Sequence, residues 1–145
     1  MSNSFYKNLS ILLILTVFLF GFNSCSKDKD EAQTNLSYRM LSDKTWFLDY
    51  VETINGSSVK TRSYLGQTTY FINFLKDNTT LDSDGISGTY TIDVVDSKIL
   101  IKVNAKTFGG NAVIYDYEVH SLGAKVLVMS NFSNGIVNKY YYSSK

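Results

Sequence analysis

Apolar and polar residues alternate with a period of two over most of the chain after residue 44. Side chains two positions apart lie on the same face of a strand, so this alternation predicts strands with one buried and one wet face. Short connections rich in glycine, asparagine, aspartate and serine favour turns between antiparallel neighbours. Eight strands are predicted, over residues 45–53, 69–75, 79–81, 88–93, 99–104, 113–120, 125–130 and 136–142.

The predicted strands follow one another at regular spacing, which is typical of a meander. Eight such strands favour an all-β fold, an antiparallel up-and-down sheet that closes on itself as a barrel. Closure also removes the exposed strand edges that promote aggregation. A two-sheet sandwich is the alternative. Residues 36–41 are expected to form one helical turn before the first strand.

The N-terminal residues have a different pattern. Lys7 precedes an almost unbroken apolar run over residues 9–22, and Ser24 and Cys25 follow that run. A cationic start, a short apolar segment and a small residue at the boundary indicate an export signal over residues 1–24. The run of 14 residues is shorter than the roughly 20 that a membrane-spanning helix needs. An ordinary secretory signal and an uncleaved membrane helix are the alternatives.

Residues 22–25, Phe-Asn-Ser-Cys, resemble the lipobox of bacterial lipoproteins. This resemblance implies cleavage before Cys25 and attachment of fatty acyl chains, such as palmitate, to that cysteine. Two or three chains would hold the protein stably at a membrane, whereas one chain holds only weakly. The polar tract over residues 26–31 resembles the surface-export tether of Bacteroidota lipoproteins. It implies the outer membrane, with a folded domain over residues 36–145 facing the exterior and a flexible tether over residues 25–35.

Composition narrows the classes of partner. Lysine and arginine number 14 against 13 aspartates and glutamates, so the charge is balanced. A chain with balanced charge lacks the excess of basic residues that indicates nucleic-acid binding. We therefore expect no nucleic-acid partner. Cys25 is the only cysteine of the chain, so no intramolecular disulfide forms. Stability must come from packing and from sheet hydrogen bonds.

Four segments resemble the small lipocalin-like domains of Bacteroidota lipoproteins: residues 41–48 with their tryptophan, Asn55-Gly56, residues 74–79 and residues 87–92. In those domains a short helix leads into a first strand that carries tryptophan, and the strands close into a calycin-type barrel. The resemblance implies that fold and a binding role. It names no ligand, cofactor or catalytic residue.

Two groups of polar residues have patterns that suit metals. Asp116, Glu118 and His120 share one face of a predicted strand, and histidine with carboxylates suits zinc or iron. We favour the simpler interpretation that they form the wet outer face of that strand. Residues 82–85 begin like a calcium loop but lack the glutamate that such a loop requires at a later position. A hairpin loop is favoured there, and no metal site is expected.

The sequence therefore predicts a surface-anchored lipoprotein that is not an enzyme and that binds a small, partly apolar ligand inside its barrel. The alternative is a barrel with a filled interior that binds a protein or glycan at the cell envelope through loops and exposed tyrosines. Tyr140, Tyr141 and Tyr142 are consecutive, so at least one of them should lie outside. The expected ligand-binding residues are Trp46, Tyr50, Tyr70, Ile72, Phe74, Tyr90, Ile92, Tyr115 and Tyr117.

Overall fold

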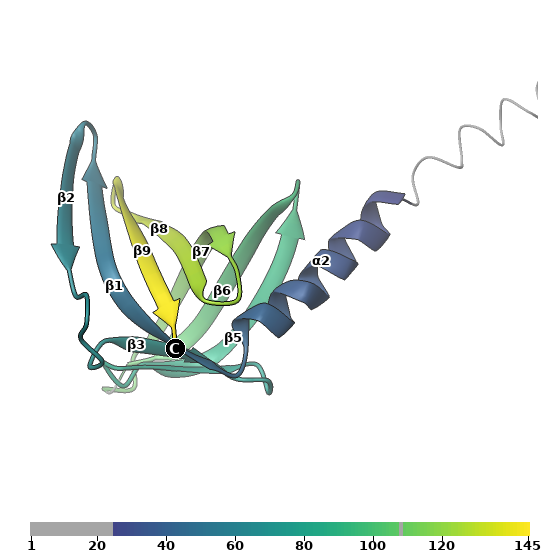
Figure 1. Cartoon of the computed structure of the whole chain (residues 1–145), viewed down its shortest axis with the longest axis horizontal. Helices are drawn as coiled ribbons and strands as arrows, with labels where there is room; N and C mark the ends of the chain where they lie inside the picture. The colour runs from purple at the N-terminus through teal and green to yellow at the C-terminus, as the bar shows by residue number, and fades with distance from the viewer. Residues whose placement is uncertain (1–24, 108) are drawn as a thin grey trace, which may run out of the picture.

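The structure is a computed structural model that describes residues 25–107 and 109–145. The predicted export signal over residues 1–24 lies outside the described residues. The described chain forms a helix followed by nine strands (Figure 1). In chain order these are α2 (Cys25–Leu41), β1 (Lys44–Asn55), β2 (Ser58–Ser63), β3 (Phe71–Phe74), β4 (Thr79–Asp82), β5 (Ser87–Val95), β6 (Lys98–Lys106), β7 (Ala112–Leu122), β8 (Val126–Ser133) and β9 (Ile136–Ser144).

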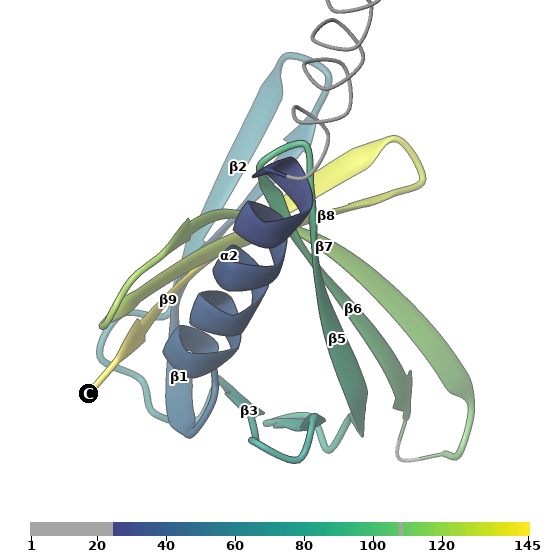
Figure 2. The same ribbon diagram turned by 90° about the vertical axis from the view of Figure 1, so that its right-hand side faces the viewer.

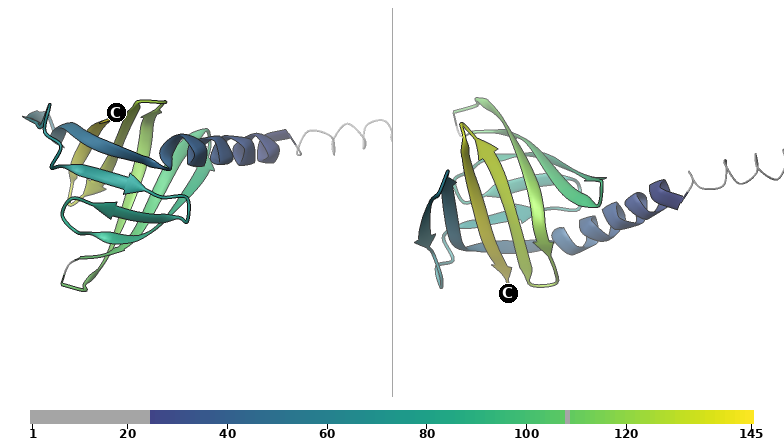
Figure 3. Two further views of the ribbon diagram at one scale, coloured as in Figure 1. Left: turned by 60° about the horizontal axis from the view of Figure 1, so that its bottom comes forward. Right: turned by 90° about the horizontal axis from the view of Figure 1, so that it is seen from above.

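Strands β1 and β3 to β9 close into an eight-stranded antiparallel barrel. Each strand pairs with the next along this series, and β9 pairs back onto β1 (Figures 1 and 3). The predicted all-β, up-and-down, lipocalin-like barrel is confirmed, and every one of the eight predicted strands is present. The sandwich alternative does not apply, because a single sheet forms the whole wall of the barrel.

Strand β2 is additional to the eight strands predicted from the sequence. It pairs with the far half of β1, from Tyr50 opposite Ser63 to Asn55 opposite Ser58, as a hairpin beyond the barrel wall (Figure 1). All residues of β2 are exposed. A strand with no buried face leaves no clear apolar alternation, so periodicity does not reveal it.

Helix α2 is longer than the single turn predicted at residues 36–41, because it begins at Cys25. The expectation of a flexible tether over residues 25–35 is therefore corrected. Physically, the segment has no glycine or proline and is rich in good helix formers such as glutamate, lysine and alanine. Asp28 in the first turn and Arg39 in the last turn also suit the helix dipole. No helix in the described part of the chain is long and apolar enough to cross a membrane.

The two ends of α2 have different surroundings. Its first turns are largely exposed and project away from the barrel, whereas its last turns approach β5 (Figures 1 and 2). Leu41 is fully buried, and its carbonyl accepts a hydrogen bond of 2.8 Å from Nε1 of the fully buried Trp46. The hydroxyl of Tyr38 accepts a hydrogen bond of 3.1 Å from the backbone N–H of Ile92. The end of the helix thus closes one end of the barrel.

A hydrophobic core fills the barrel half next to the helix. Phe74 and Tyr90 pack edge to face there, with ring centroids 5.0 Å apart. The remaining space of this half is filled by aliphatic and sulfur-containing side chains from several strands. The buried members of the core are Leu41, Trp46, Ile72, Phe74, Tyr90, Ile92, Ile101, Val103, Ala105, Val119, Leu127 and Met129.

Candidate ligand-binding site

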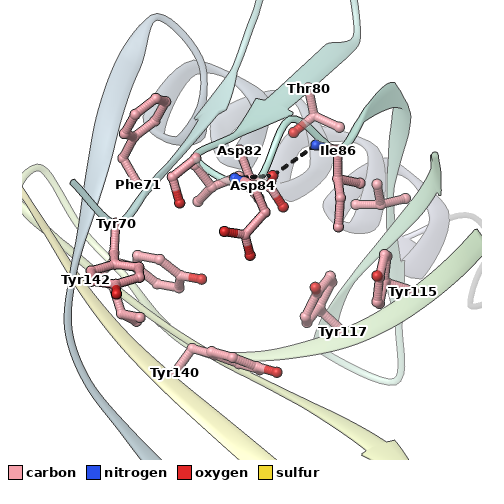
Figure 4. A pocket seen from close by; sticks show the side chains of 14 residues that line it. Tyr70, Phe71, Thr80, Asp82, Asp84, Ile86, Tyr115, Tyr117, Tyr140 and Tyr142 are labelled. Carbon is pink, nitrogen blue, oxygen red and sulfur yellow. Dashed lines mark hydrogen bonds between the residues drawn. The ribbon is translucent and has the colours of Figure 1, made fainter. Parts of the chain in front are cut away.

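The other half of the barrel encloses a cavity of about 210 Å³ (Figure 4). Residues from β1, β3, β4, β6, β7 and β9 face it, and the loop between β4 and β5 contributes further residues. The barrel interior is thus filled in one half and hollow in the other. The cavity is lined by Leu48, Tyr70, Phe71, Ile72, Thr80, Asp82, Ser83, Asp84, Ile86, Val103, Tyr115, Tyr117, Tyr140 and Tyr142.

A continuous row of tyrosine rings forms one wall. Tyr115 and Tyr117 on β7 stack with ring centroids 6.0 Å apart, and Tyr117 meets Tyr140 on β9 edge to face at 6.1 Å. Tyr140 and Tyr142 continue the row with a separation of 6.3 Å. These separations fall in the range over which aromatic rings attract one another. The wall is therefore formed before any ligand binds.

Several hydroxyl groups of this wall make no hydrogen bond to the protein. In the core, by contrast, the hydroxyl of Tyr90 donates to the carbonyl of Leu75 at 2.9 Å. Within the described part of the chain, the hydroxyls of Tyr115, Tyr117 and Tyr142 make no hydrogen bond to another protein group. They are available to water or to a ligand in the cavity.

The hydroxyls of Tyr117, Tyr140 and Tyr142 keep their protons at neutral pH. Burial raises the pKa of Tyr117, Tyr140 and Tyr142, because the phenolate form would lose its hydration inside the barrel. The neighbouring tyrosines raise the pKa of each further, since a phenolate would be repelled by adjacent negative charge. These three residues therefore offer neutral O–H groups rather than phenolates.

Two carboxyl groups lie across the cavity from Tyr140 (Figure 4). Asp82 is the last residue of β4 and Asp84 lies in the β4–β5 loop. Oδ1 of Asp82 accepts hydrogen bonds of 2.9 Å from the backbone N–H groups of Asp84 and Ile86. Burial raises the pKa of Asp82, and the nearby Asp84 carboxylate raises it further. The predicted hairpin loop at residues 82–85 is confirmed, but it also supplies the charge of the cavity.

Four of the nine residues predicted to bind a ligand line the cavity: Tyr70, Ile72, Tyr115 and Tyr117. A second group does not line the cavity and lies instead in the filled half of the barrel, where it belongs to the hydrophobic core. That group is Trp46, Phe74, Tyr90 and Ile92.

Tyr50 does not line the cavity, so its prediction is corrected. The pairing of β1 with β9 shifts register between Leu48 and Tyr50, which indicates a β-bulge at Asp49. An extra residue at a bulge moves the following side chain to the other face of the strand. Leu48 therefore faces the cavity, whereas Tyr50 stacks on Tyr141 outside it, with ring centroids 4.0 Å apart.

Ten residues that line the cavity are not among those predicted from the sequence. The sequence does contain a pattern that could have indicated Tyr140 and Tyr142, because they alternate with Tyr141 along β9. At least one of these three tyrosines was predicted to lie outside, and Tyr141 does so. Asp82 and Asp84 carry no such signal, because loop aspartates are common in turns and a loop has no periodicity to orient it. The missed residues are Leu48, Phe71, Thr80, Asp82, Ser83, Asp84, Ile86, Val103, Tyr140 and Tyr142.

Asp116, Glu118 and His120 lie on the solvent-exposed outer face of β7, as favoured from the sequence. Nζ of Lys98 lies 3.1 Å from Oε1 of Glu118, and Nε2 of His120 lies 2.8 Å from Oγ of Ser130. Asp116 pairs with Lys102 on β6. All three contacts are solvent-exposed. Among residues 25–107 and 109–145, no group of three or more histidine, cysteine, aspartate or glutamate side chains is placed to hold a metal ion.

No protein-family model matches this chain, and neither a curated protein nor a solved structure matches it. The geometry and chemistry of the cavity are therefore the indication of function that this chain offers.

Proposed function

We propose that the protein is a lipid-anchored envelope protein that binds a small, partly apolar molecule in its lipocalin-like barrel and catalyses no reaction. The observation that carries this proposal is the hollow half of the barrel, with its preformed row of tyrosines. An interior filled throughout would instead have favoured the alternative, a module that binds a protein or glycan partner through its outer surface.

The lining of the cavity suits a ligand with an apolar body and a few polar groups. Leu48, Ile72 and Val103 offer an aliphatic floor, and burial of apolar ligand surface there contributes roughly 25 cal/mol per Å². The free tyrosine hydroxyls can orient polar groups of the ligand. The cavity is smaller than the roughly 300–1,000 Å³ of pockets for drug-sized molecules, so the ligand is correspondingly small.

The proposed location depends on Cys25 and its flanking residues. Acyl chains on that cysteine would anchor the protein in the outer membrane, with the barrel facing the exterior. Helix α2 starts at Cys25 and its 17 residues extend roughly 25 Å, so it would hold the barrel away from the lipid. Replacement Cys25→Ala should release the protein from membranes washed with carbonate, and unchanged retention would contradict the anchor.

Fluorescence titration tests the binding role. The neutral probe 1-aminoanthracene should bind the protein with a saturable signal and a stoichiometry of about one, because a cavity of about 210 Å³ has room for a single small molecule. A signal that rises linearly, as for non-specific partitioning, would contradict binding in the barrel. Recovery of one envelope protein or glycan in fixed proportion would then favour the alternative function.

A further inference from the structure

The cavity described above is negatively charged and has no compensating cation. Its lining includes the carboxyl groups of Asp82 and Asp84, and no lysine, arginine or histidine lies among the lining residues that the structure describes. The ion pairs of the described chain join Lys76 to Asp43, Lys98 to Glu118 and Lys102 to Asp116. None of them neutralises the two carboxylates of the cavity.

A tyrosine hydroxyl without a protein partner gives a second indication of how a ligand would be held. Tyr142 lines the cavity (Figure 4). Its hydroxyl makes no hydrogen bond to a protein group within the described residues. This hydroxyl is therefore available to a polar group that enters the cavity.

The aromatic wall adds a third favourable element for positive charge. The faces of tyrosine rings carry negative electrostatic potential and attract cations within about 6 Å of the ring centre. Tyr140 lies across the cavity from the carboxyl groups, and Tyr117 and Tyr142 lie to either side (Figure 4). A cation in the cavity would therefore lie among aromatic rings and carboxylates together.

The two carboxylates have different capacities for a ligand. Oδ1 of Asp82 already accepts two backbone hydrogen bonds, which fix the loop. The Asp84 carboxylate accepts no hydrogen bond from a protein group within the described chain, and Asp84 is exposed at the mouth of the cavity. Asp84 is therefore the better placed of the two to pair with an incoming cation.

We propose that the ligand of this cavity is a small protonated amine with a compact apolar body. Its ammonium group would pair with Asp84 and Asp82 and donate to tyrosine hydroxyls, while its apolar body would contact Leu48, Ile72 and Val103. This inference rests on the proposed binding function and adds the chemical class of the ligand to it.

Three probes of one shape and different charge test the inference. They are 2-phenylethylamine, which is a cation at pH 7, the neutral 2-phenylethanol and the anionic phenylacetate. Isothermal titration calorimetry would use the whole protein in lipid nanodiscs, with empty nanodiscs subtracted. We expect the amine to bind at least about tenfold more tightly than the alcohol, because hydrogen bonds to charged groups are the stronger ones. The anion should bind most weakly.

Variants identify the carboxylate. Replacement Asp84→Asn removes the charge and keeps the size, so the amine should lose at least about tenfold in affinity while the alcohol changes little. The matched control is Asp116→Asn, which removes the same charge from the exposed outer face of β7 and should leave all three affinities unchanged. Replacement Asp82→Asn is a second variant, because an amide oxygen can still accept the two loop hydrogen bonds.

The outcomes separate the two proposals. Equal affinities for the amine and the alcohol, or tighter binding of phenylacetate, would overturn the amine inference and leave the binding function in place. An amine preference that persists in Asp84→Asn and Asp82→Asn would also overturn it. Failure of all three probes overturns the inference alone if 1-aminoanthracene still binds saturably. If that probe also fails to bind, the binding function itself is overturned.

Discussion

Tyr50 and Tyr141 stack on the outside of the barrel, with ring centroids 4.0 Å apart, although both belong to strands whose neighbouring residues face the cavity. The stack depends on the bulge in β1, which turns Tyr50 outward beside Tyr141 on β9. The hydroxyl of Tyr141 also donates to Oε2 of Glu52 at 2.7 Å. This outer cluster joins the two strands where the barrel closes, so it bears on stability rather than on binding.

Replacement Tyr141→Phe tests that assignment. The variant keeps the stacked ring and loses the hydrogen bond to Glu52, which should lower the free energy of unfolding by about 0.5–1.5 kcal/mol. Urea denaturation would measure the change. Binding of 1-aminoanthracene should be the same as in the parent protein, and weakened binding would contradict the outward position of Tyr141.

Replacement Trp46→Phe tests how the helix is attached to the barrel. It removes the buried hydrogen bond to the Leu41 carbonyl and leaves a space in the core, so we expect a loss of about 2–4 kcal/mol in the free energy of unfolding. Circular dichroism should follow the unfolding, because Trp46 is the only tryptophan. The control Phe132→Leu changes a side chain that is 73% exposed and should cost less than about 0.5 kcal/mol. Similar costs for both variants would contradict a structural role for Trp46.

Replacement Val103→Phe tests whether the cavity is where ligands bind. Val103 is 3% exposed and lines the cavity, so a larger side chain there should occupy the space that a ligand needs. The affinity for 1-aminoanthracene should fall at least about tenfold, which corresponds to about 1.4 kcal/mol. The matched control is Ile114→Phe, which adds an aromatic ring on the outer face of β7, where Ile114 is 61% exposed. Equal affinities for the two variants, with unchanged circular dichroism, would place the probe elsewhere.

Alkaline pH should destabilise the protein through its buried tyrosines. Burial raises the pKa of Tyr90 to about 12 and raises the pKa of Tyr142 well above its ordinary value. A group whose folded pKa is raised contributes stability that is complete below its unfolded pKa, about 10 for tyrosine, and that is lost as the pH rises toward the folded value. Tyrosines should therefore leave the melting temperature constant from pH 7 to 9 and lower it above pH 10. Replacement Tyr142→Phe should weaken that fall, and an identical pH profile would contradict the role of Tyr142.

The strands of the barrel are predictable because burial imposes alternation on them. Tyr90 and Ile92 alternate with exposed residues on β5, and the structure buries both. The turns are predictable for a related reason, since asparagine tolerates positive φ: Asn78 and Asn134 adopt φ values of 63° and 52° in two of the predicted turns. The exposed strand β2 lacks alternation, and the helical extension from residue 25 to 35 lacks an apolar face. Hydrophobic periodicity therefore predicts neither element.

The site is less predictable than the fold because it depends on departures from regularity. The alternation of Trp46, Leu48 and Tyr50 continues through the bulge at Asp49, so the sequence gives no warning that Tyr50 turns outward. The depth of each inward residue along the barrel also depends on strand register, which separates Phe74 in the core from Tyr70 at the cavity.

Native mass spectrometry of the protein, purified from the envelope of its own host, tests the central claim most directly. The claim is that the hollow half of the barrel holds one small molecule. It predicts a discrete additional mass, in a ratio of one to one, that disappears on denaturation and is absent from the Val103→Phe variant. A bare protein mass for the parent, or an additional mass that Val103→Phe retains, would contradict it.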